Sequence, residues 1–210
     1  MNTTAICTKL RRGLGKTPFQ PFFLVLSDGQ IVLVEYPEAI NLTAGRSRRP
    51  QFKVLSQEFV ELTVEYAAVR HVAPLTVSEA IAYAETVLPG TPSRKGIDPR
   101  WQAINLVGEF VRTEPRPIWE FIHRWGRHRQ VDLRTAIAVC LLEHLLEYHF
   151  ADYFPRVEQA ALSSAPFGDT CLRIWKFGQS EESANSKRLD RLDEQIEKLR
   201  QHRKKKRQPR

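Results

Sequence analysis

The chain has 210 residues, a net charge of +8 and a hydrophobic share of 42%, which fits one large or two small domains with a packed core. No stretch approaches the roughly 20 apolar residues of a membrane helix, and the first residues lack the layout of a secretory signal, so we expect a cytoplasmic protein without a transmembrane segment. Three scattered cysteines, Cys7, Cys140 and Cys171, exclude a disulfide framework and a zinc-binding spacing.

Residues 1–75 are predicted to form a small antiparallel β domain, either a sheet or a partly open barrel. Two apolar runs, Phe22–Leu26 and Ile31–Val34, flank Asp28-Gly29, a pair that tolerates the positive φ angles of a tight hairpin. Apolar and polar residues alternate between Val60 and Glu65, which indicates a strand with one buried face. The loop around Arg46, Arg48 and Arg49 separates strands of this domain.

Residues 76–96 are predicted to form a helix, capped by Thr76 or Ser78, and a linker rich in Pro and Gly. From residue 97 to 180 the apolar spacing favours helices. Asp98-Pro99 begins the first of them. The spacing of the following segments predicts a helix over 118–125 that stops at Gly126, one from Asp132 to about His149, one beginning at Pro155, and one over 170–177.

An Asp-x-Arg triplet occurs twice in this helical part, at Asp98–Arg100 and Asp132–Arg134, 34 residues apart. This distance is typical of one helical hairpin in a repeat protein. We expect each Asp to cap its helix and each Arg to reach the acid of an adjacent layer. A third copy would begin near Asp169, where Cys171 replaces the Arg. The alternative is an irregular bundle in which the two triplets are coincidental caps.

The last segment, residues 181–210, is predicted to be a basic tail, either helical or disordered. From residue 185 onward it holds eleven Lys and Arg against four Asp and Glu, so most of the net charge lies here. Its apolar residues follow a heptad-like spacing, at Leu189, Leu192, Ile196 and Leu199. Two heptads are marginal alone, so docking onto the body and fraying both stay open.

Two stretches resemble uncharacterised bacterial families. "TPFQPFFLVLSDGQIVLVEYPEAI" carries a PF-x-PF start, an L-x-DG hairpin and a Pro-Glu step, and is similar to a family of small β proteins. "DPRWQAINLVGEF", "WEFIHRWG", "DLRTAIAVCLLEHLLEYHF", "FPRVEQA" and "WKFGQ" occur in order and resemble a family of HEAT-like helical proteins. The resemblance implies the fold, an antiparallel β domain followed by a HEAT-like stack, and implies neither an activity nor a ligand.

Several polar clusters are candidates for binding. His144 and His149 are five residues apart, which does not match a helical zinc site, and the polar edge around them also fits a solvated helix end. Trp119 is offset from the apolar stripe of its helix, so we expect it to be exposed and to contact a protein partner. Candidate contacts to nucleic-acid phosphates are Arg124, Arg127 and Arg129, together with Arg203, Lys204, Lys205, Lys206 and Arg207 in the tail. Cations at a helix end and a solvated tail are the alternative explanations of these charges, and an anionic membrane surface would also attract them.

No nucleophile elbow, phosphate-binding Gly loop, Cys-x-x-Cys or HExxH occurs. We therefore expect a non-enzymatic binding or adaptor protein, without cofactor or metal, that uses a helical-repeat surface for a protein partner. The alternative is a nucleic-acid-associated protein that binds RNA or DNA through its basic tail. A hydrolase with a base near His144 or His149 is a third reading.

Overall fold

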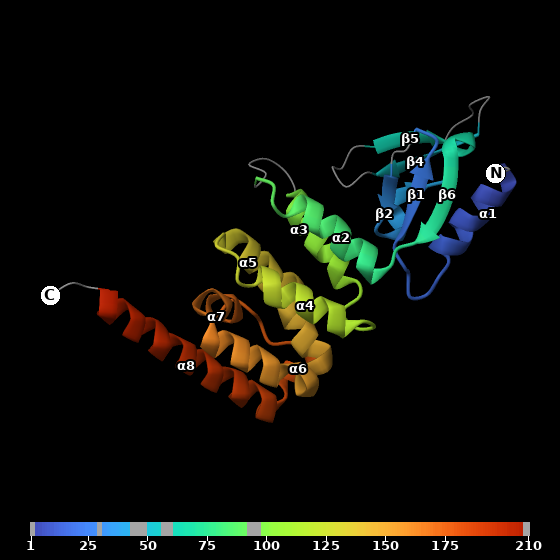
Figure 1. The fold of residues 1–210 in the computed structure, drawn as a ribbon. Coiled ribbons are helices and arrows are strands. Elements are labelled where there is room, and N and C mark those ends of the chain that lie inside the picture. Colours follow the sequence, from blue (N-terminus) through green and yellow to red (C-terminus); the bar gives the residue numbers. More distant parts are fainter. Residues whose placement is uncertain (1–2, 29–30, 43–49, 56–60, 92–97, 208–210) are drawn as a thin grey trace. The chain divides into compact units, whose positions relative to one another are not determined.

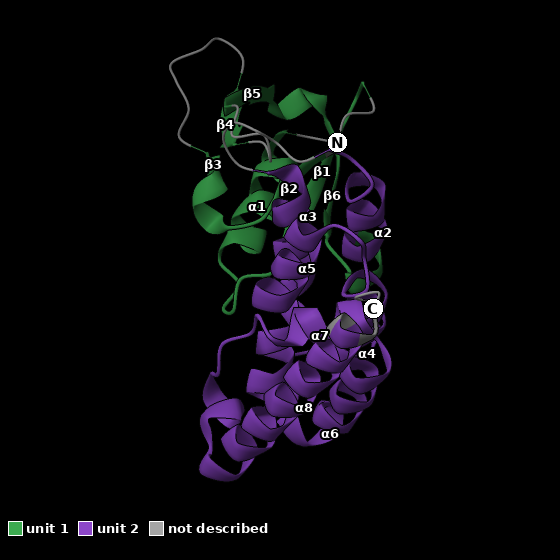
Figure 2. Ribbon diagram, turned by 90° about the vertical axis from the view of Figure 1, so that its left-hand side faces the viewer, with its two compact units in different colours: residues 1–79 green, residues 80–210 purple. Residues whose placement is uncertain are grey.

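In the computed structural model, strands dominate the first part of the chain and helices the rest, which confirms the predicted α+β order (Figure 1). The structure describes residues 3–28, 31–42, 50–55, 61–91 and 98–207, without the side chains of residues 31, 204, 206 and 207. The chain divides into two units, residues 1–79 and residues 80–210 (Figure 2).

The first unit contains two three-stranded antiparallel sheets. One has the order β2 (Ile31–Val34), β1 (Phe22–Leu26), β6 (Val69–Pro74); the other has the order β3 (Ile40–Asn41), β4 (Gln51–Leu55), β5 (Glu61–Glu65). The predicted hairpin is confirmed, because Phe22 pairs with Val34 and Val25 with Ile31. Its residues Gly29 and Gln30, and the predicted loop around Arg46, Arg48 and Arg49, lie outside the described residues. Short 3-10 turns, η1 (Pro37–Ala39) and η2 (Tyr66–Ala68), precede β3 and β6.

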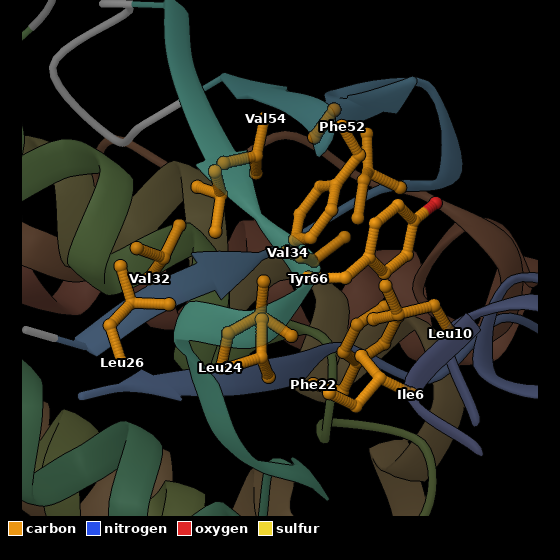
Figure 3. Close-up of a cluster of buried hydrophobic side chains, with 14 residues drawn as sticks. Ile6, Leu10, Phe22, Leu24, Leu26, Val32, Val34, Phe52, Val54 and Tyr66 are labelled. Carbon is orange, nitrogen blue, oxygen red and sulfur yellow. The ribbon is translucent and has the colours of Figure 1, made fainter. Parts of the chain in front are cut away.

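The core of this unit combines strand residues with a helix that the sequence did not predict. Every second residue of β1 is buried, as its alternating pattern requires. Helix α1 (Thr3–Leu14) contributes Ile6 and Leu10, which are fully buried one turn apart. Figure 3 shows them beside Phe22 and Tyr66, and the ring of Tyr66 lies 4.9 Å from that of Phe52. The amino-terminal part of the chain is therefore tied to the β domain by an amphipathic helix.

Helix α2 (Val77–Val87) begins with a reciprocal cap. The Thr76 hydroxyl accepts a hydrogen bond from the backbone N–H of Glu79 (3.3 Å), and the Glu79 carboxylate accepts one from the N–H of Thr76 (2.9 Å). Thr76 is thus the cap, as one of the two predicted alternatives had it.

The second unit continues as a stack of helices. They are α3 (Pro99–Gly108), α4 (Pro115–Trp125), α5 (Val131–Ile137), the π-helical turn η3 (Ala138–Leu142), α6 (Glu143–Ser163), α7 (Ala165–Cys171), the 3-10 turn η4 (Gly178–Glu181) and α8 (Ser183–Arg207). Ile104 of α3 and Leu141 of η3 are both fully buried, so these layers cover each other's apolar faces. The stop after α4 falls at Gly126 as predicted; a Cβ there would lie 2.9 Å from the ring of Phe167 on α7, so the close approach requires glycine.

Two predicted helix boundaries in this unit are wrong. No helix begins at Pro155: α6 breaks at His149 (φ −136°, ψ 38°) and continues through Pro155. The side chain of Gln179 satisfies the backbone at this break, since it accepts from Phe150 N (2.9 Å) and donates to Tyr148 O (2.9 Å). The helix predicted over 170–177 is α7, which lies earlier and ends at Cys171, and an extended segment follows it.

The first half of helix α8 docks onto the other helices, so docking is the correct one of the two predicted alternatives for this half. Leu189, Leu192 and Ile196 are buried, and α8 contacts both α6 and α7 (Figure 1). Leu199, the fourth residue of the heptad-like series, is 38% exposed. Among the described residues, no helix is long and apolar enough to span a membrane.

Candidate functional site: an arginine-lined groove

The first Asp-x-Arg triplet forms a buried bridge between layers. Asp98 caps α3, because its carboxylate accepts from the backbone N–H of Arg100 (2.9 Å). The Arg100 side chain then folds back on Asp98, with Nη2 2.6 Å from Oδ2, and also binds Asp132 of α5 and Gln130 Oε1 (3.1 Å). Arg100 is only 1% exposed. The predicted reach of this arginine to the acid of the next layer is confirmed.

Asp132 does not cap its helix, contrary to the prediction. Helix α5 begins at Val131, with Gln130 as the flanking residue and without a side-chain cap. Asp132 is therefore already inside the first turn, where its carboxylate accepts from Arg100. The predicted cap is therefore wrong: the carboxylate of Asp132 binds the side chain of Arg100 from the preceding layer and not a backbone N–H of its own helix.

The second triplet repeats the bridge one layer further on. Arg134 Nη2 lies 2.5 Å from Asp169 Oδ2, while Nη1 donates to the carbonyls of His128 (2.7 Å) and Arg129 (3.1 Å). Arg173 approaches the same Asp169 oxygen at 3.2 Å. Burial would raise the pKa of Asp169, but the hydrogen bonds from both arginines outweigh it and lower this pKa. Asp169, the acid of the incomplete third triplet, thus pairs with the arginine of the second triplet, although Cys171 stands where the other two triplets have an arginine.

Two guanidinium groups share this one carboxylate. Arg134 is 8% exposed, and its Nε is buried without a hydrogen-bond partner in the part of the chain that the structure describes; the same holds for the Nε of Arg173. Buried donors of this kind are uncommon in folded proteins. The end of the Asp–Arg series is therefore incompletely neutralised.

A groove of about 490 Å³ opens at this end, between α5, α7 and α8. Apolar side chains line part of it, including Val131, which is 50% exposed, and Leu199. Arg134, Asp169 and Arg173 form its charged wall. Arg200 and Arg203 of α8 extend the charge along the outer edge, and both are exposed. We call this site the arginine groove. It combines exposed apolar surface with four arginines and one aspartate.

Of the predicted phosphate contacts whose side chains the structure describes, only Arg203 lies in this groove. Arg124 forms an ion pair with Glu85 (2.5 Å). Arg127 lines a different pocket of about 480 Å³, between α4 and α6. Arg129 and Lys205 are exposed outside both pockets. The side chains of Lys204, Lys206 and Arg207 are outside the described residues.

The expected exposure of Trp119 is wrong. Its side chain is 6% exposed and packs against His123, Tyr153 and Phe167, with ring centroids 5.4 to 6.2 Å apart. Helix α4 is covered by α5 and α6, so its buried face is wider than a single apolar stripe. The exposed tryptophan is Trp175, at 71%, in the extended segment after α7.

The polar cluster around His144 offers no activated nucleophile. His144 Nδ1 lies 2.7 Å from Glu147, and Glu143 accepts from the backbone N–H of Trp175 (3.0 Å). Cys140 shares a pocket of about 470 Å³ with His144, but burial and the charge of Glu143 raise its pKa to about 12. Its thiol is protonated at neutral pH. No group of three His, Cys, Asp or Glu side chains in the described part of the chain could hold a metal ion.

The arginine groove cannot be predicted from the sequence. The spacing places Leu199 in a packing seam and Arg134 in a bridge between layers, and it gives no signal for Arg173 or Arg200. Only the juxtaposition of α5, α7 and α8 brings them into one cavity. A scan of family models, a search of curated proteins and a search of solved structures each found no match to this chain.

Proposed function

We propose that the protein is a non-enzymatic binding or adaptor protein whose helical unit recognises a segment of a protein partner in the arginine groove. The observation that carries this proposal is the exposed apolar surface of the groove. Val131 and Leu199 are two of the few large hydrophobic residues left exposed in the described chain, and both line the same cavity. Apolar side chains that share one concave site are typical of protein-binding surfaces.

The layered helices support this function. Bridges such as Arg100 to Asp132 and Arg134 to Asp169 hold successive layers in register, and stacked helical layers present rigid concave surfaces to peptides. The proposal includes membership of a bacterial HEAT-like family and a cytoplasmic location, in keeping with the resemblance of residues 97–180.

A second candidate function is the binding of nucleic-acid phosphates through α8. It is favoured by Arg203, which is exposed and has no ion-pair partner among the described residues, and by the exposed Lys205 close to it. Binding of this kind depends steeply on salt and is insensitive to sequence. Sequence-selective peptide binding is therefore the property that separates the two functions.

The test is a selection from a displayed library of random peptides, each about 12 residues long, on the full-length protein. Affinities of selected peptides are measured by fluorescence anisotropy for the wild type and for Val131→Thr/Leu199→Gln, which removes apolar surface without changing charge. We expect binding to weaken about tenfold or more, since the exposed apolar area of two side chains is lost.

Trp175→Ala is the control, because Trp175 is the most exposed large hydrophobic residue among those described and does not line the groove. Binding should be unchanged in this variant. Loss of binding in Trp175→Ala with no change in the groove variant, or no enrichment of any peptide, would contradict the proposal. Salt-sensitive RNA binding with no peptide selection would favour the second function.

A further inference from the structure

We infer that the charged wall of the arginine groove binds the carboxylates of an acidic partner segment, so that an Asp or Glu of the partner continues the Asp–Arg series of the stack. This inference rests on the proposed function and specifies the chemistry of the partner. It starts from the repeated pattern in which each layer's arginine meets the acid of the next layer.

The pattern ends with an excess of arginine. Arg100 lies between two acids, Asp98 and Asp132. In the next layer the ratio of arginines to acids is reversed, because Arg134 and Arg173 both pair with the single acid Asp169. Among the described residues, Asp169 is the one acid that pairs with either arginine. A partner carboxylate placed against these guanidinium groups would restore the balance that the first layer has.

The charged wall of the groove is preorganised in the protein without a partner. Arg134 is more than nine-tenths buried and is held in place by two backbone carbonyls and by Asp169. Arg173 shares Asp169 with Arg134 and keeps about a third of its side chain exposed, so a carboxylate in the groove can reach it. Guanidinium groups that are already fixed favour an anion, because the cost of ordering them has been met in folding.

The outer edge of the groove adds positive charge that is open to solvent. On α8, Arg200 follows Leu199 directly, and Arg203 lies one turn after it. Arg200 is about half exposed and forms an ion pair with Glu197 on the same helix, at 3.2 Å. At this edge of the groove basic side chains thus lie next to an apolar one, which complements a partner segment whose apolar residues stand next to acids.

The apolar part of the groove selects a peptide over a nucleic acid. A phosphate backbone would pair with Arg200 and Arg203 but would leave Val131 and Leu199 in water. An acidic peptide with apolar residues covers both kinds of surface. Protein-bound carboxylates are therefore the anions that fit the whole cavity.

The test is a charge swap on the full-length protein. Arg200→Glu/Arg203→Glu reverses two exposed charges at the groove, and Arg191→Glu/Lys198→Glu reverses two exposed charges of α8 that do not line it. Both pairs change the net charge equally. The probe is the displayed library of random peptides, with folding checked by circular dichroism.

Wild type and control pair should enrich peptides with Asp or Glu beside apolar residues, and Glu→Gln versions of these peptides should bind about tenfold more weakly. The groove pair should lose this preference and select Lys or Arg instead. Equal enrichment of acidic peptides by the groove pair would overturn the inference, as would an equal effect of both pairs, or tighter capture of single-stranded RNA than of any peptide. Enrichment of neutral apolar peptides that depends on Leu199 would overturn it while leaving the proposed function intact.

Discussion

At the scale of single residues, the stack depends on buried arginines, and Arg100 is the one whose three side-chain nitrogens are all hydrogen-bonded. Arg100 is 1% exposed and hydrogen-bonds to Asp98, Asp132 and Gln130. Arg100→Met keeps the apolar stem but leaves two carboxylates facing each other without their cation. We expect a loss of about 3 kcal/mol in unfolding free energy, the lower end of the range for breaking a buried ion pair from one side, because Asp132 is partly exposed.

Urea denaturation measures this loss. The matched control is Arg124→Met, whose ion pair with Glu85 is solvent-exposed and should contribute about 1 kcal/mol or less. If the two substitutions cost the same, the Asp–Arg series would have no special role in holding the layers together.

These residues also show which contacts of the helical unit could be predicted from the sequence. The cap at Asp98 and the reach of Arg100 to the next layer were predictable, because both follow from local spacing and from a repeat of 34 residues. The role of Asp132 was not, since a residue in the first turn and a cap have similar sequence signals. The burial of Trp119 depends on Tyr153 and Phe167, which spacing within one helix cannot reveal.

At the scale of elements, α8 docks through an apolar face that contains a carboxyl group. Asp193 lies between Leu192 and Ile196, both buried, and is itself half-buried. Burial raises its pKa to about 6; nearby Asp190 and Glu197 also raise it, and Lys176 opposes them. The position of α8 could be predicted only in part, because its heptad-like residues indicate an apolar face but do not identify the helices that cover it.

This carboxyl group makes the docking of α8 depend on pH. The pKa is higher in the folded than in the unfolded chain, so the folded state binds the proton more tightly, and stability is lost as the pH rises from about 4 through about 6. Asp193→Asn should remove this loss and stabilise the protein by about 1–2 kcal/mol near pH 7, allowing for solvent screening. The gain should vanish below about pH 3, where Asp193 is protonated in both states.

The measurement is urea denaturation across this pH range, with hydrogen exchange of α8 amides to locate the effect. Asp152→Asn, at an exposed position on α6, is the control and should follow the wild type. A constant difference between Asp193→Asn and wild type at all pH values would show that the carboxyl group does not titrate in the docked helix.

At the scale of the whole molecule, the chain holds two cores that belong to different units. Phe52 is fully buried in the first unit and Ile104 in the second. Their order was predictable from the change of apolar period, from two in the strands to about 3.6 in the helices. Helix α1 was not, because its fully buried residues are Ile6 and Leu10, with Cys7 and Leu14 only partly buried, and so short an apolar face is a weak signal.

Separate cores lead us to expect two transitions in thermal unfolding. Phe52→Leu should lower the midpoint of one transition, and Ile104→Val that of the other, each by a few degrees, because each substitution leaves a small cavity worth about 1 kcal/mol. Differential scanning calorimetry of both variants and of the double variant checks this. The double variant should show both shifts added, since distant sites contribute independently. A single transition that both substitutions move together would mean that the two units unfold as one cooperative structure.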